Sequence, residues 1–284
     1  MQGGCSRLLL TSGVSSVFAA DTAVTRTAGG AWSASISRRW WIGRGPNGGY
    51  VAAILLRAMA LELGDPDRAP RTLTVHFPAA PAEGPVALRC EVERRGRSVA
   101  TVSARMEQDG RLVALALAAF APRFEGPSFD ETVMPEVPAP EALDPVPTEP
   151  PAPPLVNNLD LRWAVGPPPF SESERALAGG WMRLRDPEPL DAPVLTLLSD
   201  AWLPAPFARQ DGIRPAPTIE LTVHFRARLP PPGAEGDFCL GFFSSRLARD
   251  GFFEEDGELW SREGVLLAQS RQLALLLGPP GPAG

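Results

Sequence analysis

The pentapeptide LTVHF occurs twice in the chain, at residues 73–77 and 221–225, and the two copies contain its only two histidines. Other segments repeat in the same order along the chain: GGAW at 29–32 is echoed by GGWM at 179–182, and QDGRLVALALAAF at 108–120 by REGVLLAQSRQLAL at 262–275. Matches that recur in one order indicate an internal duplication, and the chain is therefore predicted to contain two copies of one module of about 120–130 residues.

A proline-rich segment separates the two copies. Residues 121–155 contain eleven prolines, which cannot sit inside helices and supply few donors to a sheet, so an extended linker is expected. The boundaries that follow are an N-terminal extension (1–15), an N-terminal module (16–122), the linker (123–155), a C-terminal module (156–278) and a tail (279–284).

The first module is predicted to form a sheet around one helix. A short strand lies around 32–41, and GRGPNGG then opens a helix from about Gly48 to Leu63 that Gly64 ends. This helix is apolar nearly all round and should be buried. The expected strands that follow cover 72–77, 86–94, 99–107 and 111–120, with Asp109–Gly110 as a hairpin turn.

The second module repeats this order. Its expected elements are a strand at 181–185, a helix from about Asp191, and strands at 218–226, 238–246, 252–262 and 265–276. The fold class is therefore α+β, with antiparallel sheets wrapped around central helices. Two separate sandwiches are the alternative, but they would not explain the apolar helices.

Composition excludes several classes of function. The chain has no lysine, which excludes Schiff-base and phosphate-loop lysines, and its net charge of −6 argues against a nucleic-acid surface. Cys5, Cys90 and Cys239 lack CxxC spacing, so we expect reduced thiols in a cytoplasmic protein, with no metal and no cofactor. No apolar run approaches the roughly 20 residues of a membrane span. Residues 6–20 fit either a weak secretory signal or a ragged extension before the first strand.

Asp200 is a candidate catalytic residue because it interrupts an apolar stripe. In the second helix, with Asp191 as the N-cap and Pro193 in the first turn, Asp200 is expected mid-helix between Leu197 and Leu203 on one face. The first helix has no acid at the corresponding place. A buried carboxylate needs a partner, so Asp200 is either functional or bonded to a neighbouring amide in a structural role.

Two further polar residues occur only in the second module. Alternation along the last strand places Gln272 on the inward face, where the first module has Ala118. Thr218 opens the second LTVHF strand, where the first copy has Pro70. A surface glutamine and an ordinary strand threonine are the alternative interpretations of these two residues.

The same segments resemble a known family. PNGGYVAAILLRAM, LTVHF and RRGRSVATVSARMEQDGRLVALALAAF resemble the N-terminal half of the acyl-CoA thioesterase II family, and LLSDAWLPA, PTIELTVHF and LLAQSRQLAL resemble its C-terminal half. The resemblance covers most of the chain outside the linker and the first fifteen or so residues. It implies a double hotdog fold, with two antiparallel sheets each wrapped around a central helix.

The resemblance also implies a mechanism. Asp200, Thr218 and Gln272 match the catalytic trio of that family, which implies that Asp200 activates a water molecule held by Thr218 and Gln272, without a covalent intermediate. The absence of a GxSxG elbow agrees with this expectation. The histidines are interpreted as strand residues rather than catalysts. The implied activity is the hydrolysis of acyl-CoA thioesters without a cofactor.

Substrate contacts are expected at four positions. Backbone N–H groups of Gly48 and Gly49 could stabilise an oxyanion, although the second helix is an alternative source of donors. Arg44 and Arg97, each within an arginine cluster, are candidates for the CoA phosphates. The competing functions are a hotdog enoyl-CoA hydratase or dehydratase and a non-catalytic acyl-CoA-binding protein. A homo-oligomer is expected, with a dimer first, although one chain already holds both modules.

Overall fold

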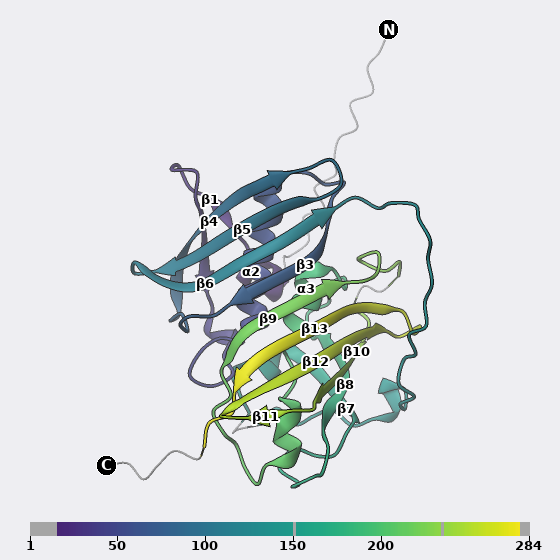
Figure 1. Cartoon of the computed structure of the whole chain (residues 1–284). Helices are drawn as coiled ribbons and strands as arrows, with labels where there is room; N and C mark the ends of the chain where they lie inside the picture. The colour runs from purple at the N-terminus through teal and green to yellow at the C-terminus, as the bar shows by residue number, and fades with distance from the viewer. Residues whose placement is uncertain (1–15, 150–151, 234–235, 279–284) are drawn as a thin grey trace, which may run out of the picture.

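The computed structural model describes residues 16–149, 152–233 and 236–278; the expected extension (1–15) and tail (279–284) lie outside the described residues. Within that part, thirteen strands form one antiparallel sheet in the order β1-β2-β4-β5-β6-β3-β9-β13-β12-β10-β8-β7, with β11 paired to β12 (Figure 1). The strands are β1 (Thr25–Arg26), β2 (Trp32–Ile36), β3 (Ala69–His76), β4 (Gly84–Arg95), β5 (Ala100–Gln108), β6 (Arg111–Ala121), β7 (Leu159–Val165), β8 (Ala176–Leu184), β9 (Thr218–Phe225), β10 (Cys239–Ser245), β11 (Ala248–Arg249), β12 (Phe252–Ser261) and β13 (Leu266–Leu275). The helices are α1 (Val17–Asp21), α2 (Gly48–Leu63) and α3 (Ala192–Leu198), with 3-10 turns at Arg38–Trp40, Pro140–Ala142, Pro154–Asn158 and Ala205–Arg209.

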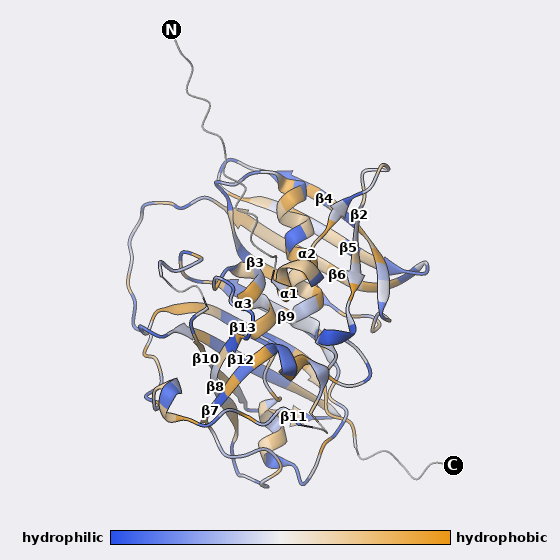
Figure 2. Cartoon of the chain, turned by 180° about the vertical axis from the view of Figure 1, so that it is seen from behind, coloured by the Kyte–Doolittle hydropathy of each residue, from blue (hydrophilic) through white to orange (hydrophobic). Residues whose placement is uncertain are grey.

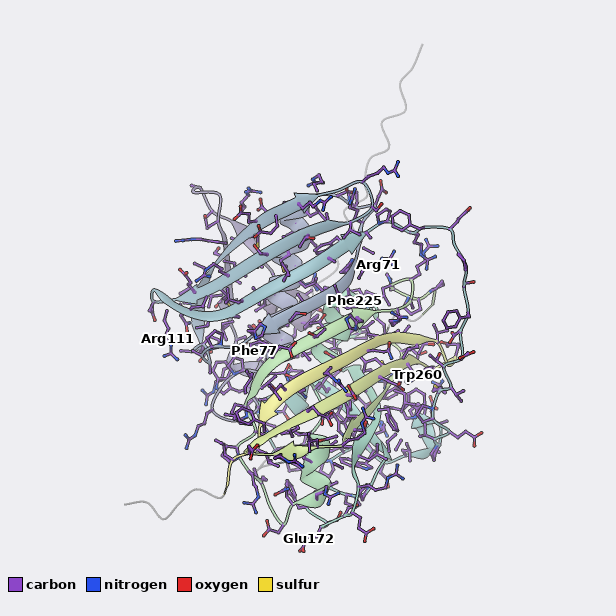
Figure 3. The ribbon with its side chains drawn as sticks, viewed as in Figure 1. Arg71, Phe77, Arg111, Glu172, Phe225 and Trp260 are labelled. Atoms are coloured by element: carbon purple, nitrogen blue, oxygen red, sulfur yellow. The ribbon has the colours of Figure 1, made fainter. Side chains whose placement is uncertain are left out.

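The two LTVHF copies pair with each other at the centre of the sheet. β3 and β9 run antiparallel with Thr74 opposite Thr222, whose hydroxyl oxygens lie 2.8 Å apart. Phe77 and Phe225, the last residues of the two copies, therefore lie at opposite ends of the junction (Figure 3). The expectation of two sheets is corrected here to one continuous sheet. Pairing supplies hydrogen-bond partners to backbone groups on the edges of β3 and β9 that two separate sheets would leave open.

Strand register confirms the equivalence of the two modules. Leu73 of β3 lies opposite Ala118, and Leu221 of β9 lies opposite Gln272. Because Leu73 and Leu221 both begin an LTVHF copy, Ala118 and Gln272 occupy the same place in their modules. The first module therefore holds a methyl group where the second holds an amide.

α2 has the bounds expected from its sequence. The side chain of Asn47 accepts a hydrogen bond from Tyr50 N as N-cap, and Gly64 ends the helix in the left-handed region with φ 62°. α2 and α3 lie on the same side of the sheet, and both are coloured mainly as hydrophobic in Figure 2. Ile54, among the fully buried residues of α2, belongs to a core that spans both modules.

α3 is shorter than predicted. Its N-cap is Asp191, as expected, but the helix ends at Leu198, so Asp200 lies in the turn beyond it and not mid-helix. Beyond Leu198 the backbone hydrogen bonds change to the i→i+3 type, from Asp200 N to Leu197 O at 3.2 Å and from Ala201 N to Leu198 O at 3.4 Å, and Pro204 prevents a helix from continuing past residue 203. Because α3 ends at Leu198, the Asp200 side chain extends from a turn and not from the surface of a helix.

The linker lies along the edge of the C-terminal module. It runs from β6 to β7 down one side of the molecule (Figure 1), and Val146 N donates to Leu161 O of β7 at 2.8 Å. Trp181 Nε1 also donates to Pro138 O at 2.9 Å. β7 itself was not predicted. In the described residues, no helix combines the length and the apolar character that crossing a bilayer requires.

Candidate active site

Asp200 lies where the end of α3 meets the beginning of α2. Its Oδ2 accepts hydrogen bonds from Asn47 Nδ2 at 2.9 Å and from Gly49 N at 3.0 Å. Asn47 Nδ2 also donates to the main-chain oxygen of Asp200 at 2.5 Å. The carboxylate is thus held by the first turn of a helix from the other module, where the helix dipole favours negative charge.

Burial sets the proton affinity of Asp200. Loss of solvent raises its pKa from 3.8 to about 6, and the backbone hydrogen bonds from Gly49 and Gly48 only partly oppose this rise. A carboxylate with a pKa of about 6 is ionised at neutral pH and is a better base than an ordinary aspartate. Asp200 is therefore a candidate for accepting a proton at neutral pH.

The glycine pair at the start of α2 is required by close packing. A Cβ on Gly49 would lie 2.6 Å from Thr196 O and 2.8 Å from Leu197 O, which are backbone atoms of α3. A Cβ on Gly48 would lie 3.0 Å from Asp200 Oδ2 and 3.2 Å from the Phe77 ring. Only glycine lets the two helix ends approach closely enough for the α2 amides to reach Asp200.

Thr218 and Gln272 contact each other directly. Thr218 begins β9, and its Oγ1 donates to Gln272 Oε1 at 2.9 Å. Gln272 lies on the neighbouring strand β13 and is only 6 % exposed. The buried residues Ala268, Ser270 and Ala274 share its face, as alternation along the strand predicted. The structure therefore brings two of the three predicted catalytic residues into one hydrogen-bonded pair on the inner face of the sheet.

Glu255 joins this pair and was missed in the sequence analysis. It lies opposite Gln272 on β12, and Gln272 Nε2 donates to Glu255 Oε1 at 2.8 Å. Ala205 N donates to the other oxygen at 2.5 Å. The available signal was alternation in FFEEDGELW, which places Glu255 on the same face as the apolar residues Phe253 and Leu259.

Glu255 also links the pair to Asp200 electrostatically. Burial raises the pKa of Glu255 to about 7, and the negative charge of Asp200 contributes to the rise. The two carboxyl groups are thus within range of each other's field, although no direct hydrogen bond joins Asp200 to Thr218 or Gln272 among the residues that the structure describes. The cluster consists of two hydrogen-bonded groups, one around Asp200 and one around Gln272.

The equivalent positions of the first module carry no such chemistry. Val102 lies opposite Ala118, just as Glu255 lies opposite Gln272. Val102 and Ala118 are both buried. Pro70 occupies the place of Thr218, since Pro70 lies opposite Phe120 as Thr218 lies opposite Ala274 on the equivalent strand. The polar cluster therefore exists once within the part of the chain that the structure describes.

The two predicted phosphate-binding arginines lie in different places. Arg44 is exposed in the loop just before α2, near the Gly48 end. The main-chain oxygen of Arg97 accepts from Arg68, which pairs with Asp65 just beyond the other end of α2. A helix of 16 residues is about 24 Å long. The structure thus sets Arg97 apart from Asp200, and its contact with phosphate stays a prediction.

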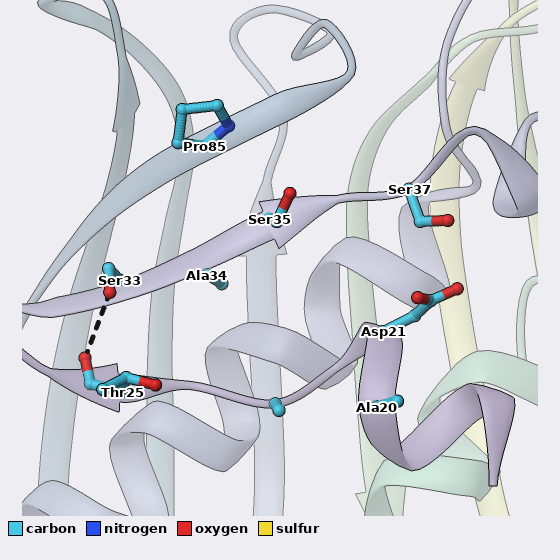
Figure 4. A pocket seen from close by; sticks show the side chains of 9 residues that line it. Ala20, Asp21, Thr25, Ser33, Ala34, Ser35, Ser37 and Pro85 are labelled. Atoms are coloured by element: carbon cyan, nitrogen blue, oxygen red, sulfur yellow. Dashed lines mark hydrogen bonds between the residues drawn. The ribbon is translucent and has the colours of Figure 1, made fainter.

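The histidines and one surface hollow lie outside the cluster. His76 and His224 are exposed on β3 and β9. A hollow of about 400 Å³ between α1, β2 and Pro85 is lined by serine and threonine hydroxyls and by Asp21 (Figure 4). Its lining does not include Asp200, Thr218 or Gln272. It is thus separate from the polar cluster of Asp200, Thr218, Gln272 and Glu255.

Comparison with known proteins gives the family. Residues 36–121 match the acyl-CoA thioesterase N-terminal domain, and residues 136–276 match the acyl-CoA thioesterase C-terminal domain. An uncharacterised protein of Mycobacterium bovis is 27 % identical over 266 residues, which cover 85 % of this chain and 89 % of that protein.

Solved structures agree with the sequence matches. A hotdog-fold protein of unknown function from Alicyclobacillus acidocaldarius is 30 % identical with a TM-score of 0.85, covering 94 % of this chain and all of that one (100 %). A candidate thioesterase II from Thermobifida fusca is 26 % identical with a TM-score of 0.80, covering 93 % of this chain and 98 % of that one. With both of its halves matched in order, the chain belongs to the acyl-CoA thioesterase family and is a thioester hydrolase of hotdog fold.

Proposed function

We propose that the chain hydrolyses acyl-CoA thioesters with a water molecule that Asp200 deprotonates and that Thr218 and Gln272 hold. The observation that carries this proposal is the single polar cluster of the C-terminal module, placed against the first turn of α2. The N-terminal module has Pro70, Val102 and Ala118 at the positions of Thr218, Glu255 and Gln272, so one reaction centre per chain is proposed.

The proposed reaction balances without a cofactor. The water oxygen attacks the thioester carbonyl carbon while its proton passes to the Asp200 carboxylate. The tetrahedral intermediate then expels the CoA sulfur, and the proton leaves Asp200 to complete the thiol. Free acid and CoA are the products. A thiolate is a moderate leaving group, since a thiol pKa is about 8.5, so no serine or cysteine nucleophile is needed.

The beginning of α2 has two successive tasks in this proposal. In the resting site its amides hold the ionised Asp200. When Asp200 takes the proton it becomes neutral, while negative charge appears on the former carbonyl oxygen. The N–H groups of Gly48 and Gly49 can then stabilise that oxyanion through the same helix terminus. Arg44, exposed in the preceding loop, is proposed to contact a phosphate of CoA.

The test is release of free thiol from short, medium, long and aromatic acyl-CoAs. Asp200→Asn should lower kcat by about 10²- to 10⁴-fold, the usual contribution of general base catalysis, and leave the circular dichroism spectrum unchanged. Asp109→Asn, the same chemical change at an exposed hairpin turn, is the control. An Asp200→Asn variant with full kcat would rule out Asp200 as the base.

Isotope labelling tests the absence of a covalent intermediate. In a single turnover in H₂¹⁸O, direct attack by water puts ¹⁸O into the released acid. A route through an Asp200 anhydride, with water attacking the Asp200 carbonyl, would instead leave ¹⁸O on the protein and release unlabelled acid. Label found on Asp200 would therefore refute the direct route.

A further inference from the structure

We propose that Glu255 is a positioning residue for the hydrolysis, fixing the side-chain amide of Gln272 so that Oε1 faces Thr218 and one Nε2–H stays free for the reacting water. This inference rests on the function proposed above. It assigns Glu255 a role through Gln272 and no contact with the reacting atoms.

The hydrogen-bond network permits one arrangement when Glu255 is ionised. An ionised carboxylate only accepts hydrogen bonds. One oxygen of Glu255 accepts from Ala205 N, a backbone donor in a 3-10 turn that cannot be exchanged for an acceptor. The other oxygen accepts from Gln272 Nε2 at 2.8 Å. Gln272 must therefore present its nitrogen to Glu255 and its oxygen to Thr218, whose hydroxyl donates to it at 2.9 Å.

The fold itself does not need an acid at this position. Val102 and Ala118 fill the equivalent pair of positions in the N-terminal module, and both are buried. Glu255 is 4 % exposed, and a buried carboxylate costs stability unless it is compensated. Since valine fills the equivalent position in the N-terminal module without loss of the fold, the carboxylate of Glu255 is best explained by its effect on the side-chain amide of Gln272.

The charges around Glu255 do not neutralise it. Asp200 and Glu254 both act to raise its pKa, together with burial, and only the hydrogen bonds from Ala205 and Gln272 lower it. On the neighbouring strand and at the end of β10, Arg271 and Arg246 pair with Asp256 instead. Asp256 follows Glu255 on β12, so its side chain points to the opposite face. Glu255 therefore depends on Gln272 and Ala205 for its hydrogen bonds.

Protonation of Glu255 should reverse the amide. Because Ala205 N keeps one oxygen as an acceptor, the proton would sit on the oxygen that faces Gln272. That oxygen would then donate, so Gln272 would turn its own oxygen toward it and its nitrogen toward Thr218. The pKa of Glu255 is about 7, so kcat should increase near pH 7 as Glu255 loses its proton and the amide returns to its active orientation. This step is separate from the increase near pH 6 that ionisation of Asp200 causes.

The test is Glu255→Gln, which keeps the shape and the bond from Ala205 N but presents an NH₂ group to Gln272. We expect kcat on an acyl-CoA to fall about tenfold to a hundredfold at pH 8, as small misplacements at a reacting centre do, with KM changed less than twofold. The loss should shrink at pH 6, where wild-type Glu255 is protonated, and the step near pH 7 should vanish. Glu263→Gln, in the exposed β12–β13 turn, is the control and should match wild type.

A double-mutant cycle tests that Glu255 acts through Gln272. Glu255→Gln should change kcat less than twofold in a Gln272→Ala background. Gln272→Ala alone should also lose the step near pH 7, which gives an answer even where Glu255→Gln fails to fold. Wild-type kcat in Glu255→Gln, or a step near pH 7 that survives in Gln272→Ala, overturns the inference. A fully active Asp200→Asn would instead overturn the proposed function, so the two failures are distinguishable.

Discussion

Asp200 should cost the protein stability at neutral and alkaline pH, and its replacement by asparagine should therefore stabilise the fold while it lowers kcat. Asparagine mimics the protonated carboxyl group. Its side-chain oxygen can still accept from Asn47 Nδ2 and Gly49 N, the two donors that hold Asp200 Oδ2. The charge disappears, and with it the cost of burying that charge.

The magnitude follows from the pKa of Asp200. Burial raises it from 3.8 to about 6, a rise of about two units, and each unit corresponds to about 1.4 kcal/mol, so the limit is about 3 kcal/mol. The sign follows because a raised pKa means that the folded state binds the proton more tightly than the unfolded state. The cost of ionisation is therefore absent below about pH 4, grows between pH 4 and 6, and is fully present above pH 7.

Urea unfolding followed by tryptophan fluorescence measures this effect, since Trp40 and Trp260 are fully buried. Asp200→Asn should be about 1–3 kcal/mol more stable than wild type at pH 8, and equal to it at pH 4. Asp109→Asn, at the exposed turn, should show no such dependence on pH. A variant that is less stable at pH 8, or a difference that does not change with pH, would refute the reasoning.

Three other expectations follow from the same contacts. In wild type, kcat/KM should fall about tenfold per pH unit below pH 6 as Asp200 gains a proton; a flat profile down to pH 5 contradicts this. Gly49→Ala should lower the free energy of unfolding by about 1–3 kcal/mol, because the new Cβ would lie 2.6 and 2.8 Å from two carbonyl oxygens of α3. Gly29→Ala is the control, since a Cβ at that position has nothing within 4 Å. Equal stability of the two variants contradicts the prediction. Cys239, fully buried and with its thiol pKa raised by that burial, should react with a thiol reagent only after unfolding; a label that peptide mass spectrometry locates on Cys239 of the folded protein, as distinct from Cys5 or Cys90, contradicts this.

The features determined by the sequence alone are those that depend on near neighbours or on the duplication. The turn GRGPNGG and Gly64 set the two ends of α2, and alternation set Gln272 on the inward face of its strand. Comparison of the two copies identified Gln272 against Ala118, and the strand register confirms that equivalence. These signals need only short-range sterics and the exclusion of apolar faces from water.

The tertiary structure alone decided which distant groups meet. β3 pairs with β9 into one sheet because each strand had an edge to satisfy, and nothing within a strand specifies a partner 148 residues away. Asp200 lies beyond the end of α3 and not within a helix, and its carboxylate accepts a hydrogen bond from Asn47, 153 residues away in the sequence. The contact between Glu255 and Gln272 became visible only from the pairing of β12 with β13, which places the two residues opposite each other. Such hydrogen bonds join residues that are far apart in the sequence. They depend on how strands pair and helices pack, which no short segment of the sequence specifies.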